Sequence, residues 1–566
     1  MSQEDGTSQE VASQDIASLR PGEGRHARRS VFQHAEADTV MFASARALPV
    51  ELEYTDPFGQ SPDPGHSFGT RIRRRRLCRI VLGLILLMQA ALTLRMHNTA
   101  FEDEALYLYV GHLEIAHLLH GAALPADYPS YFSGAPVLYP VLGAAADNVG
   151  GLAGARAVSL LAMLAATALL YGLTRRLFSE LIAVCAAIVF AVAEPTLFLG
   201  NLATYDATAL SLLALAAWLV VASAGTRWPL YALAAPVLAL AVATKYAALL
   251  WVPGVVVLAG LAAWPHRGRA AALIRPVVLT AITGGLLAAA LRYAGTDYRH
   301  GITSTTLERA AGAVPASSLL WDCVQWIGLP LLLALAGTVA YTMRPAAGTA
   351  ERVAPAGSAF RRAVLGIVLT GCALLAPANQ IRIHTLVSLQ KHVGFGLLLA
   401  APIAGAGLAW LIGDHFRRTQ FGIAVGGIAL ALGMTQANNL FNAWPDSSVT
   451  VAQLSRFLRP GGHYLVEVPE VPIYYLREHS GARPGQFSQT FNITFTGPDG
   501  RTLTGEAAYA EAIKEGYFTA IAFDYRTTPT VDQAIAHDLA VNSGYQLAAV
   551  VPESTGGREY VWVKSG

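Results

Sequence analysis

Apolar residues gather into runs of roughly 17 to 25 positions between residues 77 and 436, separated by short polar stretches. Each run can cross about 30 Å of hydrocarbon as a helix. The lipid interior offers the backbone no hydrogen-bond partner, so runs of this kind must be helical. The pattern predicts about eleven spanning helices, at residues 77–95, 151–173, 180–199, 205–224, 228–244, 246–264, 274–294, 318–342, 363–379, 393–413 and 420–436.

Composition agrees with a membrane protein. The chain is 54% hydrophobic and 14% charged, whereas ordinary soluble domains carry about 25% charged residues. Its formal net charge of +2 gives no reason to expect a nucleic-acid partner. The four cysteines lie in or beside apolar runs and lack metal-type spacing, so we expect no disulfide framework.

Positive charges predict the orientation. Residues 1–70 are polar and lack a periodic apolar pattern, which predicts a disordered cytoplasmic tail. The arginines at positions 71, 73–76 and 79 flank the first apolar run and place the N-terminus inside. Alternate loops are then basic, with Arg175, Arg176, Arg227, His266, Arg267, Arg269, Arg275, Arg344, Arg352, Arg361, Arg362, Arg417 and Arg418. Residues 71–436 are therefore predicted to form a transmembrane domain, and 437–566 to lie outside the cell.

The last 130 or so residues change in character, with short alternating segments in place of long apolar runs. Strands are predicted at 463–468, 517–525, 545–551 and 560–563, and helices at 448–458, 505–515 and 531–540. The order predicts a small α/β domain. The predicted fold class is thus a polytopic α-helical membrane protein with an extracytoplasmic α/β domain.

Ionisable groups at membrane depth are candidates for function. In this chain they fall mainly near the predicted outer ends of spans, at Arg156, Glu194, Asp206, Lys245, Arg292, Asp322, Lys391 and His392. Clustering on one side favours a site at the outer membrane face. A pathway across the bilayer would instead need such groups near the midplane.

The first outer loop begins with Phe101-Glu102-Asp103-Glu104, directly after the first span. Three acids before an apolar stretch are compatible with a helix N-terminus, which favours negative charge. They are also compatible with a carboxylate base that removes a proton from an acceptor. Residues 103–120 are predicted to form an amphipathic helix on the membrane surface. Its histidines 112, 117 and 120 lack convincing zinc spacing.

The order of motifs resembles the GT-C superfamily, in particular its protein O-mannosyltransferase-like and aminoarabinose-transferase-like branch. The matching segments are FEDEALYLYVGH after the first span, GLAGARAVSLL, NLATYDATALSLLALA, ATKYAALLWVP and SLQKHVGFGLLLAAP. The resemblance covers about residues 75–435. No single motif is decisive, but their order and their position at the outer face are those of the family.

The resemblance implies roles for individual residues. Asp103 would be the base, and Glu104 would orient the acceptor or a metal. Asp206 would be a second acid, or an ordinary helix cap. Candidates for binding the substrate are Tyr107, Arg156, Lys245, Arg292, Lys391 and His392. The alternative for the cations is a side chain that reaches to the headgroup level, and for Arg156 it is a structural ion pair.

The implied activity is transfer of a sugar from a polyprenyl-phosphate carrier to an acceptor hydroxyl at the extracytoplasmic face, with inversion. The acceptor would be a glycan of the cell envelope, a glycolipid or a protein, and the setting a bacterial plasma membrane. We expect no obligatory metal, although a divalent cation stays open. Alternatives are a lipid or glycan transporter or flippase, and a GT-C relative without catalysis.

Overall fold

The computed structural model describes residues 64–125, 128–226, 229–309, 311–343, 358–413, 416–479, 483–491, 493–542, 544–553 and 556–565. The chain divides at Pro64 into two units, and the larger one, Gly65–Gly566, holds the helical bundle and the C-terminal domain. Residues 1–63 of the predicted tail lie outside the described residues. Residues 64–70, which were predicted to be disordered, belong to helix α1 (Pro64–Thr93).

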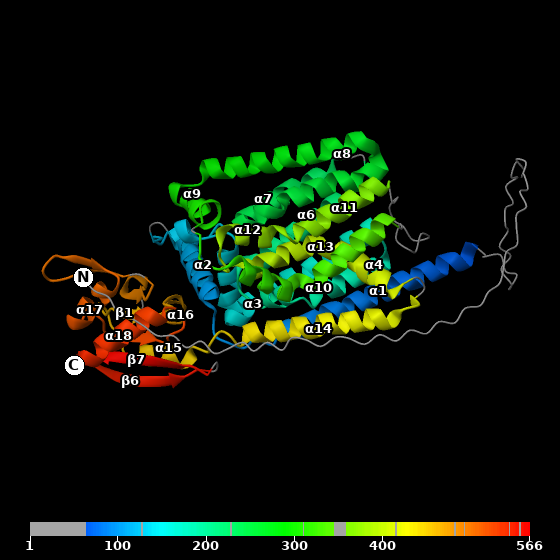
Figure 1. Cartoon of the computed structure of the whole chain (residues 1–566). Coiled ribbons are helices and arrows are strands. Elements are labelled where there is room, and N and C mark those ends of the chain that lie inside the picture. The colour runs from blue at the N-terminus through cyan, green and yellow to red at the C-terminus, as the bar shows by residue number, and fades with distance from the viewer. Residues whose placement is uncertain are drawn as a thin grey trace, which may run out of the picture. The chain divides into compact units, whose positions relative to one another are not determined.

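A helical bundle forms most of the larger unit, and α2 lies at one end of it (Figure 1). After α1, the helices are α2 (Glu102–His120), α3 (Tyr139–Leu177), α4 (Glu180–Ala191), α5 (Glu194–Gly200), α6 (Tyr205–Ala222), α7 (Ala234–Thr244), α8 (Val252–Tyr293), α9 (Thr296–Ile302), α10 (Ala316–Met343), α11 (Ala359–Cys372), α12 (Leu375–Ile383), α13 (Leu389–Ile412) and α14 (Thr419–Phe441). Short helical turns precede α3, α7 and α8, at Tyr128–Tyr131, Leu230–Leu233 and Tyr246–Trp251, and another, Thr303–Leu307, follows α9.

Seven helices in the described part of the chain are long and apolar enough to cross a membrane. The number rises to nine if α4 with α5, and α11 with α12, each form one bent span. The prediction of about eleven also counted two spans within Tyr246–Tyr293 and one over the short helix Leu230–Thr244. The multi-span helical fold is confirmed, with seven to nine spans by length and composition.

The long segment α8 is interrupted at Gly268, where φ is +78°. A Cβ atom on Gly260 would lie 2.4 Å from the carbonyl oxygen of Ala272, so the two halves of α8 approach each other across this break. A straight helix would hold these residues about 18 Å apart. The chain therefore folds back near Gly268, between the two predicted spans 246–264 and 274–294.

Helix α13 is the most buried of the long spans, because small residues let neighbouring backbones approach it. A Cβ atom on Gly407 would lie 2.0 Å from the carbonyl oxygen of Leu333 on α10. A Cβ atom on Gly405 would lie 2.6 Å from the carbonyl oxygen of Ile182 on α4. Backbone packing of this kind fixes α13 against two helices at once.

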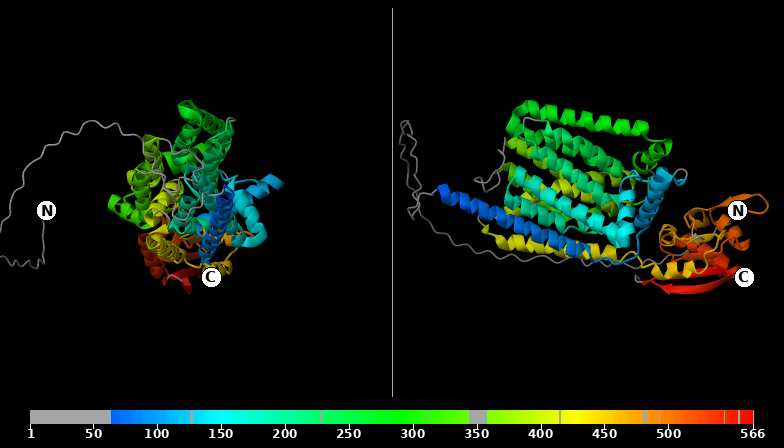
Figure 2. Two further views of the ribbon diagram at one scale, coloured as in Figure 1. Left: turned by 90° about the vertical axis from the view of Figure 1, so that its right-hand side faces the viewer. Right: turned by 180° about the vertical axis from the view of Figure 1, so that it is seen from behind.

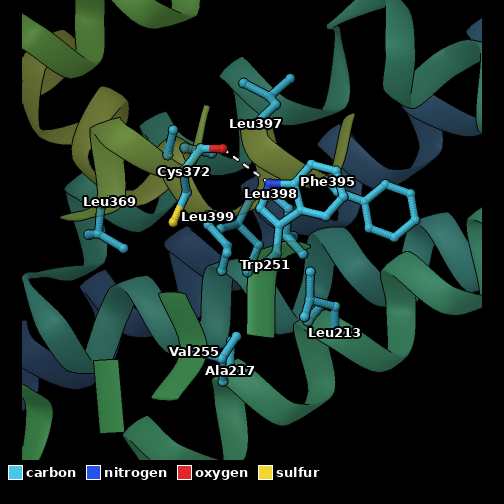
Figure 3. Packing of buried hydrophobic residues seen from close by; sticks show 14 of the residues in the cluster. Leu213, Ala217, Trp251, Val255, Leu369, Cys372, Phe395, Leu397, Leu398 and Leu399 are labelled. Atoms are coloured by element: carbon cyan, nitrogen blue, oxygen red, sulfur yellow. Dashed lines mark hydrogen bonds between the residues drawn. The ribbon is translucent and has the colours of Figure 1, made fainter. Parts of the chain in front are cut away.

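Large side chains fill the rest of this core (Figure 3). The ring of Trp251 stacks on Phe395 of α13 with centroids 5.0 Å apart. Its indole N–H donates to the carbonyl oxygen of Cys372, 3.1 Å away, so the one polar atom of the ring is satisfied. At the edge of the bundle, α1 and α14 run side by side (Figure 2), and Met96 packs with Phe441.

The C-terminal part is a small α/β domain, as predicted. Its elements are α15 (Ser448–Ser455), β1 (Tyr464–Val466), α16 (Glu470–Tyr475), β2 (Phe487–Gln489), β3 (Thr494–Thr496), β4 (Thr502–Thr504), α17 (Glu506–Lys514), β5 (Ala520–Phe523), α18 (Pro529–Val541), β6 (Tyr545–Pro552) and β7 (Arg558–Lys564). The four predicted strands and three predicted helices are present. The short elements α16, β2, β3 and β4 were not predicted.

Five strands form one mixed sheet in the order β2-β1-β5-β7-β6. Strand β1 pairs parallel with β2 and β5, whereas β7 pairs antiparallel with β5 and β6. Alternate side chains enter two cores: Leu465 and Ile521 face the core that holds α17 and α18. Tyr464 and Ala520 face the core that holds Leu454 of α15. Both faces of the sheet are therefore covered.

The orientation stays a prediction, and reporter fusions test it. A reporter fused after residue 70 should report the cytoplasm, because the arginines beside the first span favour the inside. A reporter fused after residue 450 should report the extracytoplasmic side. The same compartment for both fusions would show that the number of crossings is even. Of the basic residues on which the prediction depends, Arg227, Arg344 and Arg352 lie outside the described residues.

Candidate functional site

Glu102, Asp103 and Glu104 form the first turn of α2. The carboxylate of Glu104 accepts hydrogen bonds on both of its oxygens. Glu104 has no exposed surface. Its carboxylate accepts two hydrogen bonds from Arg156, of 2.8 and 2.7 Å. It also accepts from the backbone N–H groups of Phe101, at 2.8 Å, and Ala203, at 2.7 Å. Glu104 thus ties the start of α2 to α3 and to the segment before α6.

Arg156 makes further bonds that fit a structural role. Its guanidinium donates to the carbonyl oxygens of Asn98, at 3.0 Å, and Thr99, at 3.2 Å. It is 8% exposed and lies near the start of the spanning part of α3. Most of its donors are occupied by protein atoms, so the geometry favours the ion pair over direct contact with a substrate.

Asp103, one residue before Glu104, stays accessible. The ammonium group of Lys391, from the first turn of α13, contacts its carboxylate. The hydroxyl of Tyr107, one turn along α2, lies 3.2 Å from the other carboxylate oxygen. The side chain of Asp103 is 32% exposed, compared with 12% for Lys391. A held but accessible carboxylate is the form that a general base takes.

A second ion pair lies deeper. Lys245 Nζ is 3.1 Å from Asp206 Oδ1, and both side chains are almost completely buried. Two tyrosines join this pair to the first one. The ring of Tyr205 stacks on Tyr107 with centroids 4.4 Å apart, and their hydroxyls are 2.6 Å apart. Lys245 Nζ lies 4.6 Å from the centroid of the Tyr205 ring.

The backbone at Lys245 is held by the loop that precedes α3. Lys245 is extended, at φ −144° and ψ 109°, between α7 and the following turn. The N–H of Tyr246 donates to the carbonyl oxygen of Ser133, at 2.9 Å. A Cβ atom on Gly134 would lie 2.1 Å from the carbonyl oxygen of Thr244, so only glycine permits this crossing. The loop before α3 thus locks the position of Lys245.

Next to Lys245 is a cavity of about 400 Å³. Its polar and charged lining comes from five parts of the chain, and comprises Ser133, Lys245, Tyr246, Thr305, Thr306, Arg309, Asn379, Gln380, Arg382 and His392. Its apolar wall is formed by Leu249, Leu250, Pro253, Leu307 and Ile383, with Ala247. Among the lining residues that the structure describes there is no carboxylate. A basic lining with an apolar wall suits an anionic group attached to a lipid.

His392 lies in the wall of this cavity and is 8% exposed. In the described structure its Nε2 has no hydrogen-bond partner. Lys245, Arg309 and Lys391 are all within electrostatic range of its ring. The cations thus surround one volume, although they are distant in sequence.

Arg292, the remaining predicted phosphate ligand, lies elsewhere. It is exposed near the C-terminal end of α8 and is not part of the cavity lining. Arg309 and Arg382 take the place that was expected for it. No sequence pattern distinguishes these two: Arg309 follows the short turn after α9 and Arg382 lies in the last turn of α12, both in polar stretches of the sequence where arginine is common.

Two further acids lie beside Asp103. The pKa of Glu102 is raised to about 7, mainly by desolvation and also by the charges of Asp103 and Glu470, against the lowering effect of Lys391. Burial, with a contribution from Asp103, also raises the pKa of Glu470. Glu470 begins α16, so the C-terminal domain reaches the surroundings of Asp103.

Helix α16 also fastens α2. The hydroxyl of Tyr475 accepts a hydrogen bond of 2.7 Å from the N–H of Ala100, just before α2. Buried Asp147, in the first part of α3, accepts from Tyr474 at 2.6 Å and from Arg477 at 3.4 Å. Nε2 of His112 lies 2.6 Å from the same carboxylate. His112 is therefore an interior contact of α2, not the surface residue that was expected.

A metal site is not evident among the described residues, where no three histidine, cysteine or acidic side chains gather in a way that could hold an ion. The expectation of no obligatory metal stays a prediction.

Known proteins resemble this chain in part of its sequence and in its fold. Residues 147–293 match the family model described as dolichyl-phosphate-mannose-protein mannosyltransferase. ArnT from Cupriavidus metallidurans, solved with bound undecaprenyl phosphate, has a similar structure, with TM-score 0.56 and 14% identity over 86% of this chain and 98% of that protein. The apo oligosaccharyltransferase of Archaeoglobus fulgidus follows with TM-score 0.51 and 12% identity, over 81% and 71%.

The same ArnT in its apo state gives TM-score 0.51 and 15% identity over 85% of this chain and 97% of that protein. Comparison with curated protein sequences gives no match. The chain therefore has the fold of ArnT and of the archaeal oligosaccharyltransferase, and the resemblance to the GT-C superfamily predicted from its motifs is confirmed.

Proposed function

We propose that this chain is a membrane glycosyltransferase that transfers a sugar from a polyprenyl-phosphate carrier to an acceptor hydroxyl at the extracytoplasmic face. One observation carries the proposal: accessible Asp103 lies, through Lys391 and the tyrosines, beside a cavity lined by cations. A base and a phosphate-binding volume are the two parts that such a reaction needs. The bound undecaprenyl phosphate in ArnT supports the choice of donor.

In the proposed reaction, Asp103 accepts the proton of the acceptor hydroxyl. The hydroxyl oxygen forms a bond to the anomeric carbon, while the bond from that carbon to the phosphate oxygen breaks. The electron pair of that bond stays with polyprenyl phosphate, and the configuration of the carbon inverts. Lys391 contacts Asp103 and interacts electrostatically with Asp206 of the second ion pair. It is therefore suited to position the base relative to the leaving phosphate.

The cavity defines the donor side. Lys245, Arg309 and Arg382 would offset the negative charge that grows on the leaving phosphate. The apolar wall formed with Leu249 and Leu250 would take the first isoprenoid units of the carrier. The acceptor would approach from the exposed side of Asp103. We propose that it is a glycan of the cell envelope, a glycolipid or a protein, in a bacterial plasma membrane.

A transporter or flippase is the weaker interpretation. Such a protein needs polar groups near the bilayer midplane to form a pathway. In the described part of the bundle, the acid–base pairs of Asp103 and Asp206 lie together with the cavity at the end that contacts α2. An inactive relative that only binds the donor is the other alternative, and variants of Asp103 separate it from an enzyme.

Donor binding tests the proposed site. Lys391→Ala and Lys245→Ala should each weaken binding of a polyprenyl phosphate roughly ten- to hundredfold, because a hydrogen bond to a charged group contributes about 1.5–3 kcal/mol. Affinity would be measured by titration of the purified variants. Lys514→Ala is the matched control, since Lys514 lies on the surface of α17 and pairs with Glu511 within its own helix.

If both lysines merely reach to the headgroup level, each alanine would slightly lower stability and leave donor affinity unchanged. Unchanged affinity in both variants would contradict the proposed site. Turnover is followed in the same preparations as release of polyprenyl phosphate from a labelled sugar donor. Release that depends on an added acceptor would support transfer over transport.

A further inference from the structure

A second cavity, of about 150 Å³, lies at the opposite end of the bundle. Its lining combines the end of α3, the end of α6, the bend of α8 and the start of α11. Along α3, Arg176 lies about 30 Å from Arg156, from the rise of 1.5 Å per residue. That separation is about the thickness of the hydrocarbon core. The second cavity therefore lies at the other membrane face from Asp103.

Three of its lining residues, Arg176, His266 and Arg361, have basic side chains. In the part of the chain that the structure describes, no acidic residue belongs to the lining. Arg361 is 3% exposed and donates to the carbonyl oxygen of Leu261, 2.9 Å away. Its position is fixed by the bundle, unlike that of a basic side chain which extends into the headgroup region.

Arg176 is held in two ways. Its Nη1 donates to the carbonyl oxygen of Gly172 at 3.0 Å, and its guanidinium lies 5.1 Å from the centroid of the Trp218 ring. A Cβ atom on Gly172 would lie 2.9 Å from Nε1 of Trp218, so the glycine makes room for this stack. These contacts orient the guanidinium and leave most of its donors for a ligand.

Arg275 adds charge behind the cavity. It is 5% exposed and donates to the carbonyl oxygens of Ser223, at 3.1 Å, and Thr226, at 2.9 Å. Arg275 and Arg361 are both within electrostatic range of His266. Carbonyl dipoles only partly offset such charge. Positive charges held close together in a buried site repel each other, and a bound anion would reduce that repulsion.

We propose that this cavity binds the phosphate group of an anion, either the headgroup of an acidic phospholipid or free phosphate. Planar guanidinium groups match phosphate oxygens, and the volume holds one such group but no nucleotide or polyprenyl chain. The inner leaflet is rich in acidic lipids, and basic pockets between spanning helices bind their headgroups. The site is independent of the donor cavity and of the proposed transfer reaction.

The test uses the full-length protein in a neutral detergent, with its melting temperature as the readout. The probes are dihexanoyl phosphatidylglycerol, dihexanoyl phosphatidylcholine and inorganic phosphate. A ligand that binds only the folded protein raises the melting temperature with its concentration. We expect phosphatidylglycerol to do so in the unmodified protein. Its half-saturating concentration should rise at least about tenfold in Arg176→Gln, which loses charge-assisted hydrogen bonds.

Arg361→Gln should have the same effect, and Arg361→Lys should retain part of the binding. If Arg361→Gln does not fold, Arg176→Gln still decides, because Arg176 is only half-buried. The matched control is Arg417→Gln, an exposed arginine outside the cavity. Stabilisation by inorganic phosphate with the same dependence on Arg176 would assign the site to the phosphate group alone. Stabilisation by phosphatidylglycerol only would assign it to the lipid.

Equal stabilisation by phosphatidylcholine would overturn the proposal, and so would a response to phosphatidylglycerol that is unaltered in both Arg176→Gln and Arg361→Gln. Polyprenyl-phosphate affinity, measured in the same variants, should stay at its original value. A loss of donor affinity in the lysine variants concerns the other cavity, so failure of one proposal leaves the other intact.

Discussion

Replacement of Asp103 by asparagine should lower turnover by about a hundredfold or more, because the variant keeps the shape of the side chain but cannot accept the proton. The fold should survive, since the carboxylate is accessible and makes no contact that closes the core. Donor affinity should also survive, because the cavity lining does not include Asp103. The experiment measures single-turnover rates with saturating donor, together with donor affinity.

Asp499→Asn provides the control, since Asp499 is exposed in the β3–β4 hairpin and accepts a hydrogen bond of 3.0 Å from the N–H of Arg501 with an oxygen that asparagine keeps. A stable Asp103→Asn protein with near-native turnover would move the base to another residue. Asp206 would be the first alternative, although Lys245 occupies it in this structure. An unmodified protein that binds donor but never releases polyprenyl phosphate would favour the inactive relative.

Arg156→Met should lower the free energy of unfolding by about 3–5 kcal/mol, the usual cost of removing one partner of a buried ion pair. The variant leaves Glu104 without exposed surface and without its charge partner. It also frees the carbonyl oxygens of Asn98 and Thr99, which Arg156 holds. Unfolding in denaturant, followed in detergent, measures the effect.

The double variant Arg156→Met, Glu104→Gln should lose less than the sum of the two single variants, because the second change removes the unpaired charge. Arg292→Met is the matched control and should unfold like the original protein, since Arg292 is exposed. Equal stability of Arg156→Met and Arg292→Met would show that the pair does not hold α2 to α3.

The elements that depend on local pattern are the ones that could be predicted well from the sequence. Alternating apolar residues predicted β1 and β5, and apolar runs predicted the spans. The number of spans was less secure, because hydropathy does not record the bends between α4 and α5 and between α11 and α12, or the shortness of α7. Helix α16 has only six residues, too few to show a period.

Individual residues of the candidate site were predicted from the sequence, but the contacts between them were not. Asp103 and Lys391 are 288 positions apart, and no spacing rule links them. The resemblance supplied both residues, and the fold brings them into contact. Glu104 illustrates the reverse case, because its neighbours in sequence suggested chemistry, whereas its contacts are those of a structural carboxylate. Arg309 and Arg382 could not be distinguished from ordinary surface arginines by sequence, because only the fold shows that they line one cavity.

The close packing of α13 has a mechanical consequence. Gly405 and Gly407 bring its backbone against α4 and α10, so α13 cannot slide without separating three helices. Lys391 and His392 lie in its first turn, so the packing of α13 fixes their positions. Asp103 is anchored from two sides, since α2 is bound to α3 through Arg156 and to α16 of the C-terminal domain through Tyr475. A displacement of the C-terminal domain would therefore act on α2 and change the position of Asp103 relative to Lys391.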